Sequence, residues 1–202
     1  LKLADTFASP EDFFQRCVAR EAALKTMGIN ALRSNPHIVA YNMTGANDPL
    51  EFGEGAFTAF RELKPGTTDA IFEAFYPVHW CTFAEPVHVY RGSHVLLEAV
   101  LANEDATPPG TYPVRLQVTG PDNRKVLDRA ISITIPGQSD GREPAYALPA
   151  FREEVPIDGP TGKYRFLVTF QQGVAATGGE TAFFVTDPAD MPAVSTDVAL
   201  WG

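Results

Sequence analysis

The feature that most constrains this chain is a change of hydrophobic period near Val87. Before Val87, apolar residues recur at helical spacing, and after it apolar and polar residues alternate as in strands with one buried face. The alternation is clearest in four runs: Val95, Leu97, Ala99 and Leu101; Tyr112, Val114, Leu116 and Val118; Ile131, Ile133 and Ile135; and Tyr164, Phe166, Val168 and Phe170. About seven short strands separated by Gly-, Pro- and Asp-rich turns predict an immunoglobulin-like antiparallel β-sandwich over residues 86–188.

The beginning of the chain predicts a long helix. Ser9 can cap it, Pro10 suits the first helical position, and Asp12 completes a capping-box pattern. Pro36 closes the helix, and Gly28 is a point at which it could break or weaken. One face is predicted to be buried, because apolar residues recur along it at helical spacing: Phe14, Cys17, Val18, Leu24 and Met27.

A short apolar run, Ile38–Met43, follows this helix between turn residues and predicts a strand buried on both faces. A Gly-rich acidic loop comes next, and then a second helix is predicted from Thr67 or Thr68 to about Tyr76, with its inner face formed by Ile71, Phe72 and Phe75. A lone strand–helix unit cannot bury its own faces. Residues 1–80 therefore predict the last helix–strand–helix portion of a larger α/β domain, and Trp80 is expected to pack the joint between that domain and the sandwich.

The far end of the chain predicts a further domain. Residues 189–202 contain a Pro-rich linker and then the apolar run Val198–Gly202, which is typical of the start of a new α/β domain. Both ends are therefore expected to have been cut from a longer protein.

Composition argues against several classes of function. The net charge of −9 opposes binding to nucleic acid, and no basic cluster offsets it. No apolar run reaches the length that a membrane span needs. The four histidines and two cysteines lack the spacing of metal ligands, and Gly53 and Gly55 lack the third glycine of a nucleotide fingerprint. We therefore expect no metal, cofactor, nucleic acid or membrane, while the localisation stays open between the cytoplasm and a secreted or periplasmic site.

Five segments of the first 65 residues resemble clan A glycoside hydrolases of bacteria, especially β-galactosidase-like and family 2-like enzymes: Ala31–Pro36, Tyr41–Gly45, Asp48, Gly53–Gly55 and Phe60–Pro65. The resemblance implies the C-terminal end of a (β/α)8 TIM barrel followed by an immunoglobulin-like sandwich, which begins near Glu85–Tyr90. It also implies a retaining enzyme that acts on O-glycosidic bonds, with its catalytic Glu residues after the fourth and seventh barrel strands. Both positions would lie upstream of Leu1, so the resemblance places no catalytic residue in this chain.

The resemblance places the loop after Met43 near the sugar pocket. The residues expected to bind substrate there are Asn42, Thr44, Asn47, Asp48 and Glu51. Carboxylates and amides suit this role because they accept hydrogen bonds from sugar hydroxyls. A structural alternative stays open for Asp48, which could cap the turn before Pro49. Arg61 and Lys64 are expected to anchor the closing loop through backbone carbonyls and carboxylates.

Two other functions stay open. The sandwich could be a non-catalytic module that binds carbohydrate or mediates assembly, which oligosaccharide titration of residues 86–188 would reveal. The parent could also be a degenerate relative that no longer cleaves sugars. In the enzyme hypothesis the partners are the carbohydrate substrate and the remainder of the parent polypeptide. The isolated chain is expected to form homo-oligomers or to leave residues 1–80 poorly ordered.

Overall fold

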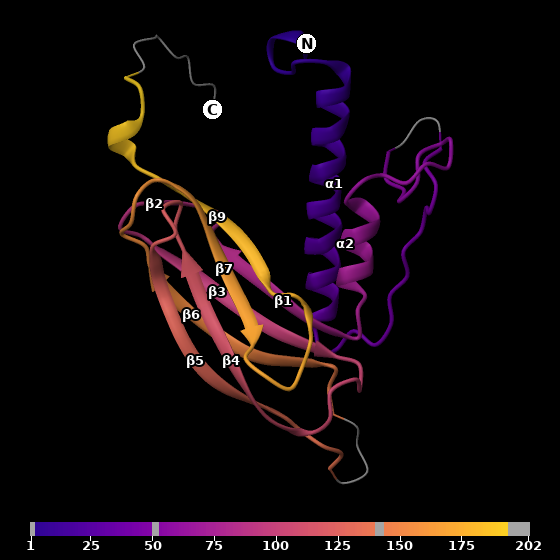
Figure 1. Cartoon of the computed structure of the whole chain (residues 1–202), viewed down its shortest axis with the longest axis vertical. Helices are drawn as coiled ribbons and strands as arrows, with labels where there is room; N and C mark the ends of the chain where they lie inside the picture. The colour runs from indigo at the N-terminus through magenta and orange to yellow at the C-terminus, as the bar shows by residue number, and fades with distance from the viewer. Residues whose placement is uncertain (1–2, 50–52, 140–143, 194–202) are drawn as a thin grey trace, which may run out of the picture.

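The computed structural model describes residues 3–49, 53–139 and 144–193. Figure 1 shows a β-sandwich with two helices standing against one side of it. The helical elements are η1 (Leu3–Asp5), α1 (Pro10–Arg33), α2 (Thr67–Ala74) and η2 (Pro188–Asp190). The strands are β1 (Val78–Glu85), β2 (His88–Tyr90), β3 (His94–Asn103), β4 (Gly110–Thr119), β5 (Lys125–Ile135), β6 (Ala147–Pro156), β7 (Gly162–Phe170), β8 (Thr177–Gly178) and β9 (Glu180–Thr186).

The strands form two sheets, so the predicted sandwich is present. One sheet has the order β6-β3-β1-β8 and the other the order β2-β9-β7-β4-β5. Most neighbours are antiparallel, and the short strands β8 and β2 add parallel to β1 and β9. The core between the sheets is apolar, and its largest fully buried side chains include Trp80, Leu97, Leu116, Phe166 and Phe183.

The sandwich begins at Val78 rather than at residue 86, which corrects the predicted domain boundary. Both faces of β1 are buried, from Val78 to Thr82 without interruption. A strand buried on both faces shows no alternation, so its period could not be read from the sequence. Trp80 lies in the sandwich core against Phe170, with ring centroids 5.0 Å apart. The expectation that Trp80 packs the joint was therefore wrong.

Two tyrosines fasten turns at the ends of the sandwich. Tyr164 Oη donates a hydrogen bond to the Pro160 carbonyl at 2.9 Å, and Tyr112 Oη donates to the Pro108 carbonyl at 2.9 Å. The first has the form of a tyrosine corner, in which a tyrosine near the start of a strand bonds to the backbone a few residues upstream. Gly159 must be glycine, because a Cβ there would lie 2.1 Å from Tyr164 Oη.

Helix α1 begins as the capping residues predicted. The Asp12 amide donates to Ser9 Oγ at 3.1 Å, and the Ala8 amide donates back to Asp12 Oδ2 at 3.1 Å. Gly28 does not interrupt the helix, which continues to Arg33. Helix α2 begins at Thr67 and ends at Ala74, two residues before the predicted end. Its cap is Gly66, whose φ of 81° places it in the left-handed region, and not a threonine side chain.

The predicted buried face of α1 is mostly wrong. Of that set only Val18 is buried, while Leu24 is 50% and Met27 is 56% exposed. The exposed apolar residues include an outer stripe along one side of the helix, formed by Phe13, Cys17, Leu24 and Met27. Polar residues, Asn30 and Arg33, are buried instead, because α2 and β1 pack on the other side of α1. The inner face predicted for α2 is only partly formed, since Phe72 is exposed.

Residues Ile38–Met43 do not form the predicted strand, and all six are exposed or half-buried. A single strand needs neighbouring strands to take its backbone hydrogen bonds, and the one backbone bond found here joins the Ile38 amide to the Asn35 carbonyl at 3.1 Å. The predicted end of a barrel is therefore not seen among the described residues before Val78. At the other end, the predicted apolar run Val198–Gly202 lies outside the described residues.

Candidate functional site

The loop between the helices is built around Lys64, whose side chain is only 2% exposed. Its Nζ lies 2.8 Å from Asp48 Oδ2 and 3.0 Å from Glu21 Oε2, and it donates to the Gly53 carbonyl at 2.8 Å. The single ammonium group thus joins α1 to two points of the loop. This agrees with the expectation for Lys64, whereas the side chain of Arg61 is exposed.

The Lys64 ammonium is held in its charged form. Burial by itself lowers the pKa of Lys64, but the hydrogen bonds to Asp48 and Glu21 outweigh burial and raise the pKa above its usual value. A second cation, Lys25, supports the same cluster, since its Nζ lies 3.5 Å from Glu21 Oε1 and donates to the Glu54 carbonyl at 2.5 Å. Two ammonium groups, those of Lys64 and Lys25, therefore tie the loop to α1.

Asp48 has a structural task in this loop. Besides the Lys64 ion pair, Asp48 Oδ1 accepts a hydrogen bond from the Gly55 amide at 2.6 Å. The Asp48 amide donates to the Phe57 carbonyl at 2.8 Å, so both ends of the residue tie the two sides of the loop. A Cβ at Gly55 would lie 2.7 Å from the Asn47 carbonyl carbon, which explains the glycine.

The structure describes three of the other four residues that are predicted to bind a sugar. Asn42, Thr44 and Asn47 are exposed on the segment that leads into the loop. Glu51 lies outside the described residues. The role of all five in sugar binding stays a prediction.

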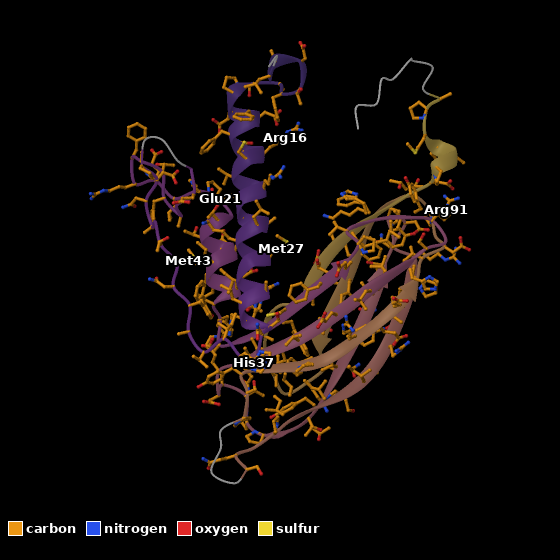
Figure 2. The ribbon with its side chains drawn as sticks, turned by 180° about the vertical axis from the view of Figure 1, so that it is seen from behind. Arg16, Glu21, Met27, His37, Met43 and Arg91 are labelled. Carbon is orange, nitrogen blue, oxygen red and sulfur yellow. The ribbon has the colours of Figure 1, made fainter. Side chains whose placement is uncertain are left out.

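Glu21 is the residue of this cluster that the sequence reasoning missed. It lies in the middle of α1, far in sequence from Asp48 and Lys64, and no local pattern links the three. The available signal was the pair Glu21 and Lys25, which are four residues apart and therefore lie on one side of α1. Figure 2 shows Glu21 and Met27 on opposite sides of the helix.

A second polar cluster joins the helices to the sandwich around His79, which is fully buried. His79 Nε2 lies 2.7 Å from Asn30 Oδ1 on α1, and Nδ1 lies 3.0 Å from Thr177 Oγ1 on β8. The Thr177 hydroxyl donates to the Glu73 carbonyl on α2 at 2.6 Å, so it can only accept from His79. A neutral imidazole carries one N–H, which here lies on Nδ1 and donates to Thr177 Oγ1. Nε2 is then an acceptor, so the Asn30 amide has to be turned by 180° to place its NH2 group against Nε2.

Arg33 completes this joint beside His79. Its Nη1 donates to the Ala74 carbonyl at 2.5 Å and the Tyr76 carbonyl at 2.8 Å, and Nη2 donates to Glu104 Oε1 at 2.9 Å. The last residues of α1 are thereby tied to the end of α2 and to the residue after β3. Cys81, on the same outward face of β1, is buried, and burial raises the pKa of its thiol to about 12. Cys81 is thus a small buried thiol and not a nucleophile.

The joint is expected to weaken in acid. Burial lowers the pKa of His79 to about 4 from 6.5, and the Arg33 charge acts in the same direction. The unfolded chain therefore binds more protons between these values, and stability present above pH 6.5 is lost as the pH falls toward 4, by on the order of 3 kcal/mol. Denaturant unfolding at a series of pH values measures this loss.

The variant His79→Gln isolates this effect from the carboxylates that titrate in the same range. Its free energy of unfolding is expected to change much less between pH 6.5 and 4 than that of the unmutated chain. The matched control is His88→Gln at an exposed position on β2, which is expected to retain the full loss. Equal pH profiles for His79→Gln and the unmutated chain would contradict the prediction.

Two further findings concern the described residues alone. No three His, Cys, Asp or Glu residues within ranges 3–49, 53–139 and 144–193 gather in a way that could hold a metal ion. No helix in this part of the chain is long and apolar enough to cross a bilayer.

Comparisons with known proteins do not show a family for this chain. No protein-family model matches the sequence, and no curated protein matches it. Among solved structures, a glycosyl hydrolase family 2 member from Bacteroides cellulosilyticus DSM 14838 is 16% identical with a TM-score of 0.38, over 54% of this chain and 15% of that one. A second structure, from microfluidic crystals of the Bacteroides cellulosilyticus family 2 member, gives the same identity and TM-score over 54% and 14%.

A third likeness is to the Pseudomonas fluorescens alkylpurine DNA glycosylase AlkC bound to DNA with an abasic site analog. It is 16% identical with a TM-score of 0.34, over 59% of this chain and 33% of that one. This chain thus spans a small part of each of these structures. At such scores the likenesses carry no argument about function.

Proposed function

We propose that this chain is the C-terminal part of a retaining, β-galactosidase-like glycoside hydrolase. In this proposal residues before Val78 belong to the end of a catalytic barrel, and the sandwich is an accessory domain fixed to it. The bond-breaking carboxylates would lie on the preceding part of the polypeptide. Asn42, Thr44, Asn47, Asp48 and Glu51 would lie on the loop near the sugar pocket.

The observation that carries the proposal is the outer stripe of α1. Its members, Phe13, Cys17, Leu24 and Met27, lie on the side of the helix opposite the residues that pack on α2. Apolar residues exposed along one side of a helix mark a face that can pack against another element. In an α/β barrel the packing partner of such a helix is the central sheet.

The sandwich, in contrast, is complete in itself. Its two sheets enclose a closed apolar core, and its tyrosine corner is formed. The Asn30–His79–Thr177 and Arg33–Glu104 contacts fix it to the helices. These features support an accessory role in which the sandwich holds the last helices of a barrel in place.

The test is hydrolysis of aryl β-galactosides. Residues 1–202 alone are expected to release no aglycone, whereas the natural polypeptide extended upstream of Leu1 is expected to hydrolyse the substrate with retention at the anomeric carbon. Release of the chromogenic aglycone and NMR of the first sugar product measure both points. In the extended protein, Leu24→Glu combined with Met27→Glu is expected to abolish activity, because the stripe would have to be buried against the sheet.

The control for this double variant is Met191→Glu, an equally exposed methionine after β9. It is expected to leave activity unchanged. Turnover by residues 1–202 alone would contradict the placement of the carboxylates upstream. An inert extended protein would contradict the assignment to an active enzyme.

A further inference from the structure

A cleft of about 560 Å³ lies at the joint between the helices and the sandwich. Its walls come from the end of α1, the segment after it, the end of α2, the end of β3 and the residues before β6. The side chains that define its chemistry are Arg33, Tyr41, Phe75, Glu104, Asp105 and Tyr146. Its volume is in the range of small-molecule sites, and it is separate from the Lys64 loop. In Figure 2, His37 marks the segment that borders it.

The charged groups in the cleft have both signs. The buried Arg33 guanidinium bonds to Glu104 Oε1 at 2.9 Å, and the Glu104 side chain remains 46% exposed, so its second oxygen can accept from a ligand. Asp105 follows with φ of 55°, a left-handed conformation that Asp tolerates better than most residues. An anion would meet two carboxylates, and a cation would meet the guanidinium. The cleft therefore favours a neutral ligand that donates hydrogen bonds.

The aromatic groups favour a flat apolar surface on the same ligand. Tyr41 and Phe75 are packed together with ring centroids 5.3 Å apart, and Tyr146 is 49% exposed. Burial raises the pKa of Tyr41, so its hydroxyl keeps its proton at neutral pH and can donate as well as accept. Aromatic faces pack on the C–H face of a sugar ring, while carboxylates accept from its hydroxyls.

We propose that this cleft binds a neutral pyranoside, a mono- or disaccharide. Its ring would lie against Tyr146 and Tyr41, and its hydroxyls would donate to Glu104 and Asp105. The site lies within residues 33–147 of this chain and does not depend on a catalytic barrel. It can therefore exist whether or not the proposed function is correct.

The experiment is an NMR titration of the full chain with lactose and with cellobiose at millimolar concentration. Amide signals of residues around the cleft are expected to shift with saturation, while those of the Lys64 loop stay unchanged. Tyr146→Ala is expected to weaken binding by about two- to tenfold through the lost ring contact. Asp105→Asn, which keeps a residue suited to the left-handed backbone, is expected to weaken it as well.

The matched control is Tyr90→Ala, since Tyr90 is 53% exposed on β2 and does not line the cleft. It is expected to leave the affinity unchanged. Flat titrations with both sugars would overturn the proposal, and so would equal weakening by Tyr90→Ala and Tyr146→Ala. Stronger binding of tetramethylammonium or inorganic phosphate than of either sugar would overturn the choice of a neutral ligand. Activity assays of the extended protein do not enter this result, so failure here leaves the proposed function standing.

Discussion

Replacing Trp80 by alanine is expected to lower the free energy of unfolding by about 3 to 5 kcal/mol, the usual cost of deleting a fully buried tryptophan. Trp80 is 1% exposed at the centre of the sandwich and packs against Phe170. Its Nε1 has no hydrogen-bond partner among the described residues, so the loss is one of apolar packing. Because small domains are stable by only about 5 to 15 kcal/mol, the variant is expected to be close to unfolding. Denaturant unfolding followed by circular dichroism measures the change.

The control variants separate a core role from a role at the joint. Tyr90→Ala, at an exposed position, is expected to change the free energy of unfolding by less than about 0.5 kcal/mol. Trp80→Phe keeps much of the volume and is expected to cost far less than alanine. If Trp80→Ala loosened only the helices, so that amide exchange rose in α1 and α2 but not in β4 and β7, its placement in the sandwich core would be wrong.

Replacing Lys64 by methionine is expected to destabilise the loop between the helices by about 3 kcal/mol, the lower end for breaking a buried ion pair. The substitution leaves Asp48 and Glu21 as two neighbouring carboxylates that lie largely out of water, and it leaves the Gly53 carbonyl without its donor. The effect is local, because the sandwich has its own core. Faster amide exchange at Asp48 and Gly55 and easier proteolysis of the loop measure it.

A triple variant tests whether the unpaired charges cause the loss. Adding Asp48→Asn and Glu21→Gln to Lys64→Met removes the unpaired charges and is expected to restore part of the protection. The matched control is Lys125→Met, which breaks an exposed pair with Asp128 and is expected to have little effect on stability. If Lys64→Met were as mild as Lys125→Met, the loop would not depend on the buried ammonium.

The sandwich could be predicted because its strands have one wet and one dry face, so that Val114, Leu116 and Val118 alternate with polar neighbours. The capped start of α1 could be predicted because Ser9, Pro10 and Asp12 act within one turn. Only part of the Lys64 cluster could be predicted from the sequence. The anchoring role of Lys64 follows from its place near an acidic loop, whereas its partner Glu21 comes from the middle of a helix 43 residues away.

The sequence by itself determined the elements whose physics is local: the helix start, the turns and the alternating strands. Only the tertiary structure decided which side of α1 is buried, because α2 and β1 pack against the face that carries Asn30 and Arg33. The more apolar face of the helix, with Leu24 and Met27, stays exposed. It also decided that residues 38–43 are not a strand, since a strand exists only where neighbours accept its hydrogen bonds. It likewise decided that β1 begins at Val78, because burial of both faces removes the alternation by which a strand is recognised.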